Sequence, residues 1–336
     1  MVDTIKHQRP RVFSGIQPSG MLHIGNYLGA IRPAALRQDS VDGLFCIVDM
    51  HALTSSEKPE VRKRLTREIA AMYIACGIDP AKSTIFVQST VPAHAECCWI
   101  LNCISPLGWL ERMTQFKAKS LTRHGINIGL LDYPVLQAAD ILLYDTDEVP
   151  VGEDQKQHIE FARDIAQRFN RLFGDTFKLP SAVIPGSGKR IRALNDPSKK
   201  MSKSDTSKPN HAIRLTDEPD VIRHSIRNAV TDIRNEIKFS DDPDKAGINN
   251  LLEIYEGITN TSRSQIENHF VGKGYDTLKT EVAEVVIESL QPIRQRFIEL
   301  INAPEELNMV LKSGAMVASA IAESKMDEIK QKVGLL

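Results

Sequence analysis

The chain has 336 residues, and 42% of them are hydrophobic, so it is long enough for one large or two ordinary soluble domains. Its 42 basic and 43 acidic side chains leave a formal net charge of -1. This balance excludes a global electrostatic field that would attract a polyanion. Any contact with nucleic acid must therefore use local basic patches.

The five cysteines contain no Cys-x-x-Cys pair, so neither a disulfide framework nor a zinc ribbon is expected. Such cysteine usage fits a reducing compartment. Residues 1–10 are polar, and no later segment is apolar for long enough to span a bilayer. We therefore expect a cytoplasmic protein without a membrane segment.

The first half of the chain alternates between β-forming and helical segments. Short apolar runs predict strands at residues 11–14, 43–48 and 84–87. Helical periodicity predicts helices at residues 25–38, 59–76, 92–104, 136–144 and 154–173. This alternation is typical of parallel βαβ units, so we expect an α/β fold with helices wrapped around a sheet.

The second half lacks clear strand signals. Residues 217–336 show successive amphipathic helical patterns, and a Pro- and Gly-containing stretch at residues 241–247 predicts a break between helices. We therefore expect two domains, residues 1–205 with the sheet and residues 206–336 with helices only. The last helix is expected to pack back on the first domain.

A glycine-containing turn follows the first expected strand. Gly15 and Gly20 lie in this turn, and Gly25 lies in the His-Ile-Gly-Asn sequence at residues 23–26, where a helix is expected to begin. A helix N-terminus presents free backbone N–H groups and a positive dipole end to a phosphate, and glycines let a ligand approach closely. The pattern predicts nucleotide binding, although an ordinary strand-to-helix turn has the same features.

A lysine-rich segment, Lys-Met-Ser-Lys-Ser at residues 200–204, is the second candidate. Its charges suit a polyphosphate, and the Pro and Ser residues around it predict a mobile loop that closes on substrate. A solvated basic linker is the alternative, because most charge runs are solvated. A P-loop is excluded, since Val183 stands where the first glycine is needed and Arg190 follows Lys189 in place of Ser or Thr.

Both segments resemble the signatures of class I aminoacyl-tRNA synthetases. Residues 23–26 are similar to the His-Ile-Gly-His motif of that class, and residues 200–204 are identical to its Lys-Met-Ser-Lys-Ser motif. Within the class, residues 13–20, Asn26 and residues 149–158 resemble the tryptophanyl branch. The resemblance covers essentially the whole chain and is strongest at residues 13–51, 111–119, 133–167 and 197–204.

The resemblance implies a Rossmann-like, doubly wound catalytic domain, an all-helical domain that binds the tRNA anticodon, and a homodimer. The implied substrates and partners are ATP, L-tryptophan and tRNA(Trp). Mg²⁺ is expected to accompany the leaving pyrophosphate without a dedicated cage of protein ligands. In the implied reaction the tryptophan carboxylate attacks the α-phosphorus of ATP, and catalysis comes from positioning and electrostatic stabilisation.

The residues that the resemblance implies in catalysis are His23 and Asn26 on the α-phosphate side, and Lys200 and Lys203 on the β- and γ-phosphates. Asp154 is expected to accept hydrogen bonds from the ribose. The full nucleotide-binding set carried over by the resemblance is Gln17, Ser19, Gly25, Asn26, Lys119, Gly152, Asp154, Lys200, Met201, Ser202, Lys203 and Ser204.

Asp140 is the residue expected to recognise the substrate side chain. Gln137 and Asp140 are three positions apart, so they share one helix face, and Pro134 is expected in the first turn of that helix. Residues 132–155 contain no Lys, Arg or His, so a buried Asp140 needs another donor, and the indole N–H satisfies it. A solvated or capping Asp is the alternative. The implied tryptophan-binding set is Phe13, Gly15, His51, Tyr133, Gln137, Asp140, Val149, Val151 and Gln155.

Two other functions stay open at this point. Some tryptophanyl enzymes have Met where this chain has Gln137, and tyrosyl enzymes hold the phenol hydroxyl with a Gln and an Asp three residues apart. Tyrosine is therefore the alternative substrate. A nucleotidyltransferase-fold protein that does not charge tRNA is the second alternative, although it would have no need of the long helical region.

Overall fold

The computed structural model describes residues 9–55, 57–120, 127–184, 191–202 and 210–335. The strands are β1 (Arg11–Ile16), β2 (Asp42–Ile47), β3 (Ser83–Val87), β4 (Glu148–Pro150) and β5 (Ser181–Val183). The α-helices are α1 (Ile24–Asn26), α2 (Arg32–Arg37), α3 (Pro59–Ala75), α4 (Ala93–Asn102), α5 (Leu107–Glu111), α6 (Thr114–Ser120), α7 (Ile128–Leu142), α8 (Lys156–Phe173), α9 (Pro219–Arg227), α10 (Ala246–Thr259), α11 (Arg263–Phe270), α12 (Tyr275–Asn302) and α13 (Pro304–Val333). Shorter helical segments are η1 (Tyr27–Ile31), η2 (His51–Thr54), η3 (Gln88–Thr90), η4 (Glu153–Gln155) and η5 (Pro243–Lys245).

The five strands form one parallel sheet in the order β3-β2-β1-β4-β5. The chain places β2 and β3 on one side of β1 and then crosses to place β4 and β5 on the other side. The expected doubly wound, Rossmann-like sheet is therefore confirmed, and its switch point lies between β1 and β4. Ligands of such sheets bind beyond the carboxyl ends of the strands at the switch point.

The strands are apolar because helices cover both faces of the sheet. Phe45 and Ile47 of β2 belong to a core shared with α3, α10 and α12, whereas Leu44 and Cys46 belong to a core shared with α4, α7 and α8. Neighbouring residues of a strand point to opposite faces, which separates the two cores. The first core continues from the sheet into the helical second half of the chain without a break.

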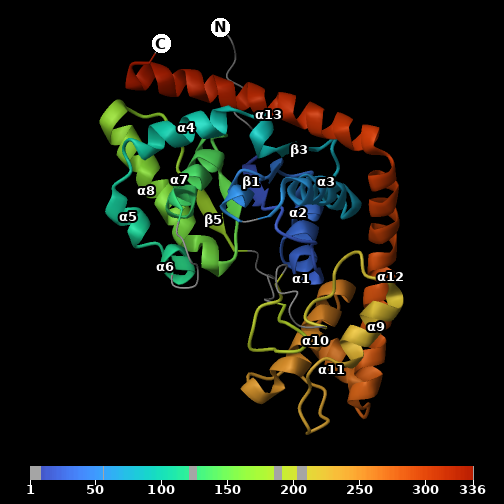
Figure 1. Cartoon of the computed structure of the whole chain (residues 1–336). Coiled ribbons are helices and arrows are strands. Elements are labelled where there is room, and N and C mark those ends of the chain that lie inside the picture. The colour runs from blue at the N-terminus through green and yellow to red at the C-terminus, as the bar shows by residue number, and fades with distance from the viewer. Residues whose placement is uncertain (1–8, 56, 121–126, 185–190, 203–209, 336) are drawn as a thin grey trace.

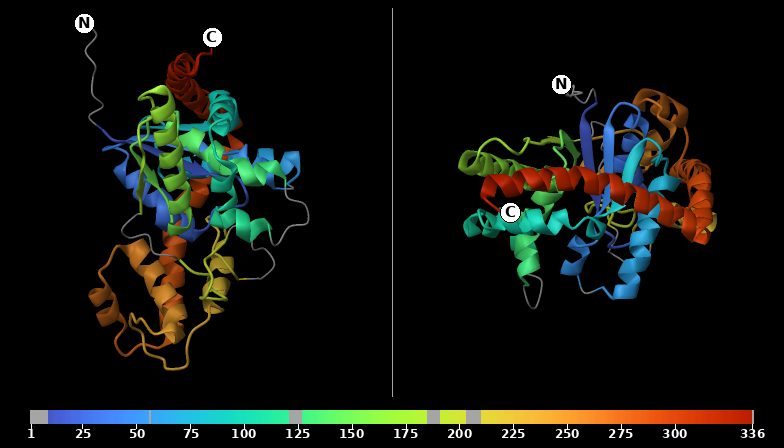
Figure 2. Two further views of the ribbon diagram at one scale, coloured as in Figure 1. Left: turned by 90° about the vertical axis from the view of Figure 1, so that its left-hand side faces the viewer. Right: turned by 90° about the horizontal axis from the view of Figure 1, so that it is seen from above.

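Helix α13 closes the β3 edge of the sheet. It runs across one end of the molecule beside β3 and α4, as Figures 1 and 2 show from two sides. The close approach needs a glycine, because a Cβ at Gly314 would lie 1.9 Å from the carbonyl oxygen of Ile85. Near its end, Lys325 Nζ lies 2.9 Å from Asp145 and donates to the Thr176 carbonyl at 3.0 Å. Covering an edge strand in this way prevents pairing with another chain.

Helix α7 is longer than the sequence indicated. It begins at Ile128, where the side chain of Asn127 accepts a hydrogen bond from the backbone N–H of Leu130. Pro134 lies inside the helix, so its expected place in the first turn is wrong. Proline costs an interior helix one hydrogen bond, but Leu130 and Val135 are buried. Burial of this apolar face favours helix on both sides of the proline.

The expected break at residues 241–247 is only partly correct. Helices α9 and α10 are separated by residues 228–245, but Gly247 lies inside α10. A Cβ at Gly247 would lie 2.0 Å from the carbonyl oxygen of Val230. Glycine is therefore needed here for close packing against the preceding loop, and not for a turn.

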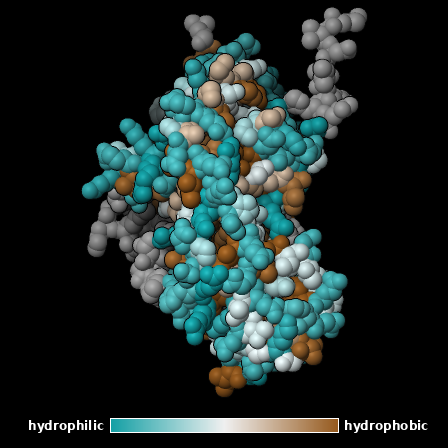
Figure 3. Space-filling model, turned by 90° about the vertical axis from the view of Figure 1, so that its right-hand side faces the viewer, coloured by the Kyte–Doolittle hydropathy of each residue, from teal (hydrophilic) through white to brown (hydrophobic). Residues whose placement is uncertain are grey.

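The surface along α12 is mostly hydrophilic, with apolar side chains scattered over it (Figure 3). Helix α12 buries Leu278, Val282, Val286 and Leu290 along one face. Among the described helices, none combines the length and the apolar composition that crossing a bilayer requires.

Replacing Gly314 with Ala is expected to lower the melting temperature, because the added methyl group forces α13 away from β3. Overpacking of this kind costs about 1–3 kcal/mol. Gly108→Ala is the matched control, since a Cβ added at this position in α5 would meet nothing within 4 Å. Thermal unfolding followed by circular dichroism measures both variants. Equal melting temperatures for the two would contradict the packing described for Gly314.

Candidate active site

The turn after β1 is joined to the helical half of the chain through backbone hydrogen bonds. The N–H of Ile24 donates to the carbonyl of Ile213 at 2.9 Å, and the N–H of Leu215 donates to the carbonyl of Leu22 at 3.0 Å. His23 precedes α1, and its backbone N–H donates to Asn26 Oδ1 at 3.2 Å. These bonds hold the beginning of the helical run α1-η1-α2 at the carboxyl end of β1.

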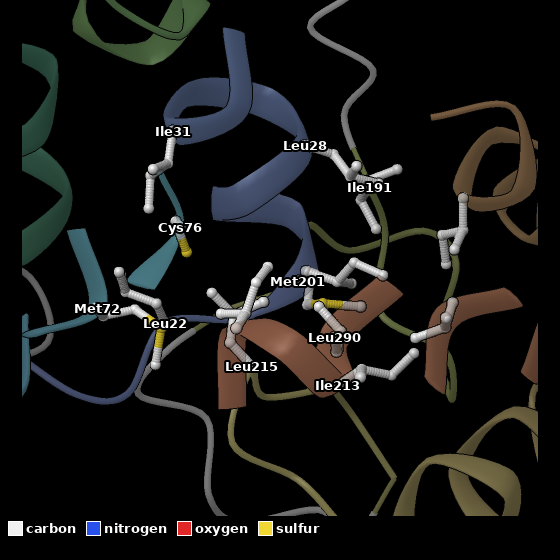
Figure 4. Close-up of a cluster of buried hydrophobic side chains, with 14 of the residues drawn as sticks. Leu22, Leu28, Ile31, Met72, Cys76, Ile191, Met201, Ile213, Leu215 and Leu290 are labelled. Atoms are coloured by element: carbon white, nitrogen blue, oxygen red, sulfur yellow. The ribbon is translucent and has the colours of Figure 1, made fainter. Parts of the chain in front are cut away.

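Met201, in the middle of the lysine-rich segment, is 1% exposed and packs in the hydrophobic core. Its backbone N–H donates to the carbonyl of Ile191 at 3.2 Å, and the N–H of Ser202 donates to His211 Nε2 at 3.2 Å. Figure 4 shows the side chain of Met201 among Leu22, Leu28, Ile191, Ile213, Leu215 and Leu290. The side chain of Met201 thus anchors the segment to the core, and the nucleotide contact that the resemblance implies for Met201 stays a prediction.

A cavity of about 280 Å³ brings the two motifs together. Asn26 from the first motif and Lys200 from the second both line it, and Lys200 Nζ lies 3.7 Å from Asp154 Oδ1. The cavity is lined by His23, Gly25, Asn26, Gly29, Ala30, Pro150, Val151, Gly152, Glu153, Asp154, Ile184, Ile191 and Lys200. Its place between the ends of β1 and β4 is the switch point of the sheet.

A second cavity of about 230 Å³ extends this site along β1. It shares Asn26 and Pro150 with the first cavity and adds Gly15 and Gln17. Asn26, a lysine and a carboxylate line the combined space, which suits a nucleotide with its phosphates near Lys200 and its sugar near Asp154.

Some predicted nucleotide-binding residues cannot be placed in this site. Lys203 and Ser204 lie outside the described residues, and the side chain of Lys119 in α6 also lies outside them. Ser19 lies in the turn after β1, where its N–H donates to the carbonyl of Gln17 at 2.9 Å. The contacts predicted for these residues stay predictions.

Asp140 lies 1% exposed in α7, and side chains from three other elements surround its carboxylate. Oδ1 accepts hydrogen bonds from Gln88 Nε2 and His94 Nδ1, both at 2.6 Å. Oδ2 accepts from His51 Nε2 at 2.8 Å. The other donors that a buried Asp140 was expected to need are thus present within the protein, in addition to any that the substrate supplies. Its donors come from η2, η3 and α4, which all precede residues 132–155 in the sequence.

The hydrogen bonds to Asp140 keep its carboxylate ionised. Burial by itself raises the pKa of Asp140, but the hydrogen bonds and charges of His51 and His94 outweigh burial and hold the pKa well below its usual range. The site therefore contains a permanent buried negative charge next to the carboxyl ends of β2 and β3.

Gln88 and His94 are site residues that sequence reasoning missed. Gln88 directly follows β3 and is fully buried, and His94 lies in the first turn of α4 with no exposure. A polar residue directly after a parallel strand is a usable signal, because the carboxyl ends of parallel strands meet at the ligand-binding edge. No comparable sequence signal marks His94 as a site residue, because its neighbours Ala93 and Ala95 are apolar.

Three of the predicted tryptophan-binding residues, Phe13, His51 and Tyr133, are linked to this carboxylate directly or through aromatic neighbours. Phe13 is buried and stacks on Tyr144 with ring centroids 5.7 Å apart. His51 meets the Tyr133 ring edge-on, at a centroid distance of 6.3 Å, and the Tyr133 hydroxyl lies 2.7 Å from His158 Nε2.

The remaining predicted residues lie on β1, α7 and the segment from β4 into η4. Val149 is buried in β4, Val151 lines the larger cavity beyond its end, and Gln137 is half-buried one turn before Asp140. Gln155 Nε2 donates to Asp154 Oδ2 at 3.3 Å, and Gly15 lines the smaller cavity. The fold thus carries the predicted amino-acid side and the predicted nucleotide side of the site at one edge of the sheet.

Comparison with known proteins agrees with this geometry. Residues 5–291 match the family model of tRNA synthetases class I (W and Y). The chain therefore belongs to the class I tRNA synthetases of this family.

Curated relatives narrow the assignment within that class. A tryptophan--tRNA ligase of Wolinella succinogenes is 51% identical over 98% of this chain and 99% of its own length. The crystal structure of the tryptophanyl-tRNA synthetase of Mycoplasma pneumoniae matches with a TM-score of 0.91 and 34% identity, over 98% of both chains. That of Campylobacter jejuni, complexed with ADP and tryptophan, matches with a TM-score of 0.83 and 36% identity, over 97% of this chain and 100% of the other. The chain is thus a member of the tryptophan--tRNA ligases.

Replacing Asp140 with Asn is expected to reduce stability in a pH-dependent way. Because the pKa of Asp140 is lower in the folded chain than its unfolded value of about 3.9, the ionised carboxylate stabilises the fold above that pH, and this contribution is lost as the pH falls. The variant should lose about 3 kcal/mol at neutral pH, the cost of breaking a buried charged network. The difference should shrink below about pH 4.

Thermal unfolding of both proteins from pH 7 to pH 3 measures this difference. Asp196→Asn makes the same chemical change at an exposed ion pair with Lys199, where solvent screening leaves little energy to lose. A constant difference between wild type and Asp140→Asn over the whole pH range would show that the charge of Asp140 does not stabilise the fold.

Proposed function

We propose that this chain activates L-tryptophan with ATP to form tryptophanyl-adenylate and then transfers the tryptophanyl group to tRNA(Trp). The single observation that carries the proposal is the cavity that Asn26 and Lys200 line together at the switch point of the sheet. The names of relatives such as the Wolinella succinogenes tryptophan--tRNA ligase support the same activity. An enzyme of this kind works in the cytoplasm, where its tRNA is found.

In the first step the tryptophan carboxylate attacks the α-phosphorus of ATP, and the bond to the bridging oxygen breaks to release pyrophosphate. His23 and Asn26 line the cavity, and we assign their side chains to the α-phosphate as hydrogen-bond donors. Lys200 also lines the cavity and suits the β- and γ-phosphates. Mg²⁺ is expected on the phosphate oxygens with water as its other ligands, which is its usual coordination in such sites.

Lys200 and Asp154, which form an ion pair at 3.7 Å, both line the cavity. Both side chains are more than half exposed, with side-chain accessibilities of 54% and 59%, so the pair contributes little energy to the fold. ATP offers each partner a better contact, phosphate for Lys200 and ribose hydroxyls for Asp154.

On the amino-acid side, the ionised Asp140 is the acceptor for the indole N–H, and Phe13 and Val149 supply apolar walls. The phenol hydroxyl of tyrosine is also a donor, so Asp140 alone does not separate the two substrates. The relatives of high identity are tryptophan--tRNA ligases, which favours tryptophan over the tyrosine alternative that Gln137 left open.

Transfer of the tryptophanyl group to the tRNA releases AMP. We assign the anticodon contacts to the helical region, residues 206–336, and the catalytic chemistry to residues 1–205. We also propose that two copies of the chain form a homodimer. The homodimer is supported by a concave surface that encloses a cavity of about 490 Å³. This concave surface lies beside His51 and Tyr133, and the exposed apolar side chains of Leu53 and Trp99 line it.

The substrate assignment is tested by ATP–pyrophosphate exchange with tryptophan and tyrosine supplied separately. Exchange should depend on tryptophan, with a preference in kcat/KM of about 10,000-fold or more over tyrosine, as for other sites that pair with one polar substrate atom. Formation of tryptophanyl-tRNA, and its decrease with rising salt, should follow. Exchange with tyrosine alone would overturn the assignment, and exchange without tRNA charging would support the nucleotidyltransferase alternative.

Replacing Lys200 with Ala should lower the rate of pyrophosphate exchange about 100- to 1,000-fold, because one donor to the developing phosphate charge is lost. The melting temperature should stay close to that of the wild type, since Lys200 is exposed. Lys199→Ala is the matched control, because Lys199 pairs with Asp196 and does not line the cavity. An equal decrease of the exchange rate in both variants would mean that the lysine-rich segment acts only through its overall positive charge, and not through a specific contact of Lys200.

Replacing Trp99 with Lys should weaken the homodimer by about 2 kcal/mol or more, as for a tryptophan at the centre of an interface. Leu172→Lys is the control, because Leu172 is an exposed apolar residue on α8 that does not line the concave surface. Sedimentation equilibrium measures the monomer–dimer equilibrium of each. A wild-type chain that stays monomeric at micromolar concentration would contradict the proposed homodimer.

A further inference from the structure

The two oxygens of the Asp140 carboxylate are used unequally. Gln88 Nε2 and His94 Nδ1 both donate to Oδ1 at 2.6 Å, whereas Oδ2 receives one hydrogen bond within the described part of the chain, from His51 at 2.8 Å. Each carboxylate oxygen has about two lone-pair positions. Oδ1 is therefore filled by the protein, and Oδ2 keeps one position for a further donor.

Gln88 can only donate to Asp140 in the orientation that the structure gives it. Its Oε1 accepts a hydrogen bond from the backbone N–H of Met50 at 3.1 Å, which turns the Nε2 end of the amide toward Asp140. Met50 directly precedes His51, the donor to Oδ2. The side chain of Gln88 therefore links Oδ1 of Asp140 to the loop that carries His51, the donor to Oδ2.

His94 is held by a similar two-sided contact. Its Nδ1 lies against Oδ1 of Asp140, and since a carboxylate only accepts, Nδ1 carries the proton. Its Nε2 lies 2.8 Å from the Tyr144 hydroxyl. Burial raises the pKa of Tyr144, so the hydroxyl keeps its proton and can donate to Nε2. The chain Tyr144–His94–Asp140 thus has one direction of hydrogen bonding when the imidazole is neutral.

The terminal torsion of an aspartate has broad energy minima, so packing alone does not fix the plane of its carboxylate. Two donors on Oδ1 that are themselves held by Met50 and Tyr144 do fix it. Without them the carboxylate can rotate, and Oδ2 loses its alignment with an incoming donor. Tyr144 also stacks on Phe13, the expected wall of the indole pocket, which ties the carboxylate plane to the plane of that wall.

We propose that Gln88 and His94 are positioning residues that fill Oδ1 of Asp140 and so reserve Oδ2 for the indole N–H of the substrate. Tyr144 acts one step further away, by holding the imidazole of His94. This inference rests on the proposed function, because it assumes that Asp140 accepts the indole N–H. It predicts that substrate selectivity depends on residues that touch only the carboxylate and never the substrate.

The test compares tryptophan with an isosteric analogue in which the sulfur of a benzothiophene replaces the indole N–H. The ratio of their kcat/KM values in ATP–pyrophosphate exchange measures how much the enzyme gains from that one hydrogen bond. Gln88→Met removes the amide donor at similar volume, and Tyr144→Phe removes the hydroxyl but keeps the stack on Phe13. Ile100→Val, a small packing loss in the same helix α4, is the matched control.

In Gln88→Met the ratio should fall about tenfold or more, the size of an effect from one misaligned charged hydrogen bond. The fall should come from tryptophan alone, while kcat/KM for the analogue and KM for ATP stay near the wild-type values. Tyr144→Phe should shift the ratio in the same direction by a smaller factor. Ile100→Val should leave the ratio unchanged, and melting temperatures of all variants show whether each is folded.

Equal losses for tryptophan and the analogue in Gln88→Met and Tyr144→Phe would overturn the positioning role and leave the proposed function intact. A wild-type enzyme that uses both substrates equally well would overturn the role of Asp140 as well. A wild-type enzyme that shows no exchange with tryptophan would overturn the proposed function itself. If Gln88→Met does not fold, Tyr144→Phe alone decides, because it removes a single atom from the far end of the network.

Discussion

The packing of one lysine-rich segment against the start of one helix is the contact on which the candidate site depends. Met201 is buried with Leu22 and Leu28, while Ile213 and Leu215 hydrogen-bond to the backbone on either side of His23. These contacts are apolar or between backbone groups, so they persist whatever the charge state of the lysines. They bring Lys200 and Asn26 into the lining of one cavity. A polyanion can then bridge two motifs that lie far apart in the sequence.

A second constraint is the buried charge of Asp140. An ionised carboxylate with 2% side-chain exposure is unfavourable unless donors replace its water. The fold supplies them from η2, η3 and α4, which begin just after β2 and β3 or one turn later. Desolvation of this negative charge at the ligand-binding edge of the sheet is unfavourable. Hydrogen bonds from residues 46 to 89 positions away in the sequence offset the desolvation free energy.

The C-terminal helix α13 ties the two halves of the chain to this arrangement. Gly314 allows it to lie directly on the β3 edge, and Lys325 joins it to Asp145 and the Thr176 carbonyl on the far side of the sheet. Gln88 and His94 follow β3 closely in sequence, so the helix that covers this strand also supports the donors of Asp140. The helical region is thus continuous with the core of the sheet domain and not a loosely attached module.

The sequence by itself determined the local features. The strands at β1, β2 and β3, the glycine-containing turn, the lysine-rich segment and the membership of the class all follow from short patterns, because strand burial and motif chemistry are encoded within about ten residues. The structure also places Gln17, Asn26, Asp154 and Lys200 in the linings of two cavities that share Asn26, Ala30 and Pro150.

Only the tertiary structure decided the features that depend on distant contacts. Met201 belongs to the core although its motif suggested a ligand contact, and Pro134 lies inside α7 because burial of the helix face outweighs one lost hydrogen bond. The partners of Asp140 could not be found from its own segment, since they come from elements that the parallel topology brings to the same edge. Sequence patterns report what each residue prefers locally, whereas a buried carboxylate is satisfied by whichever donors the complete fold places within about 3 Å.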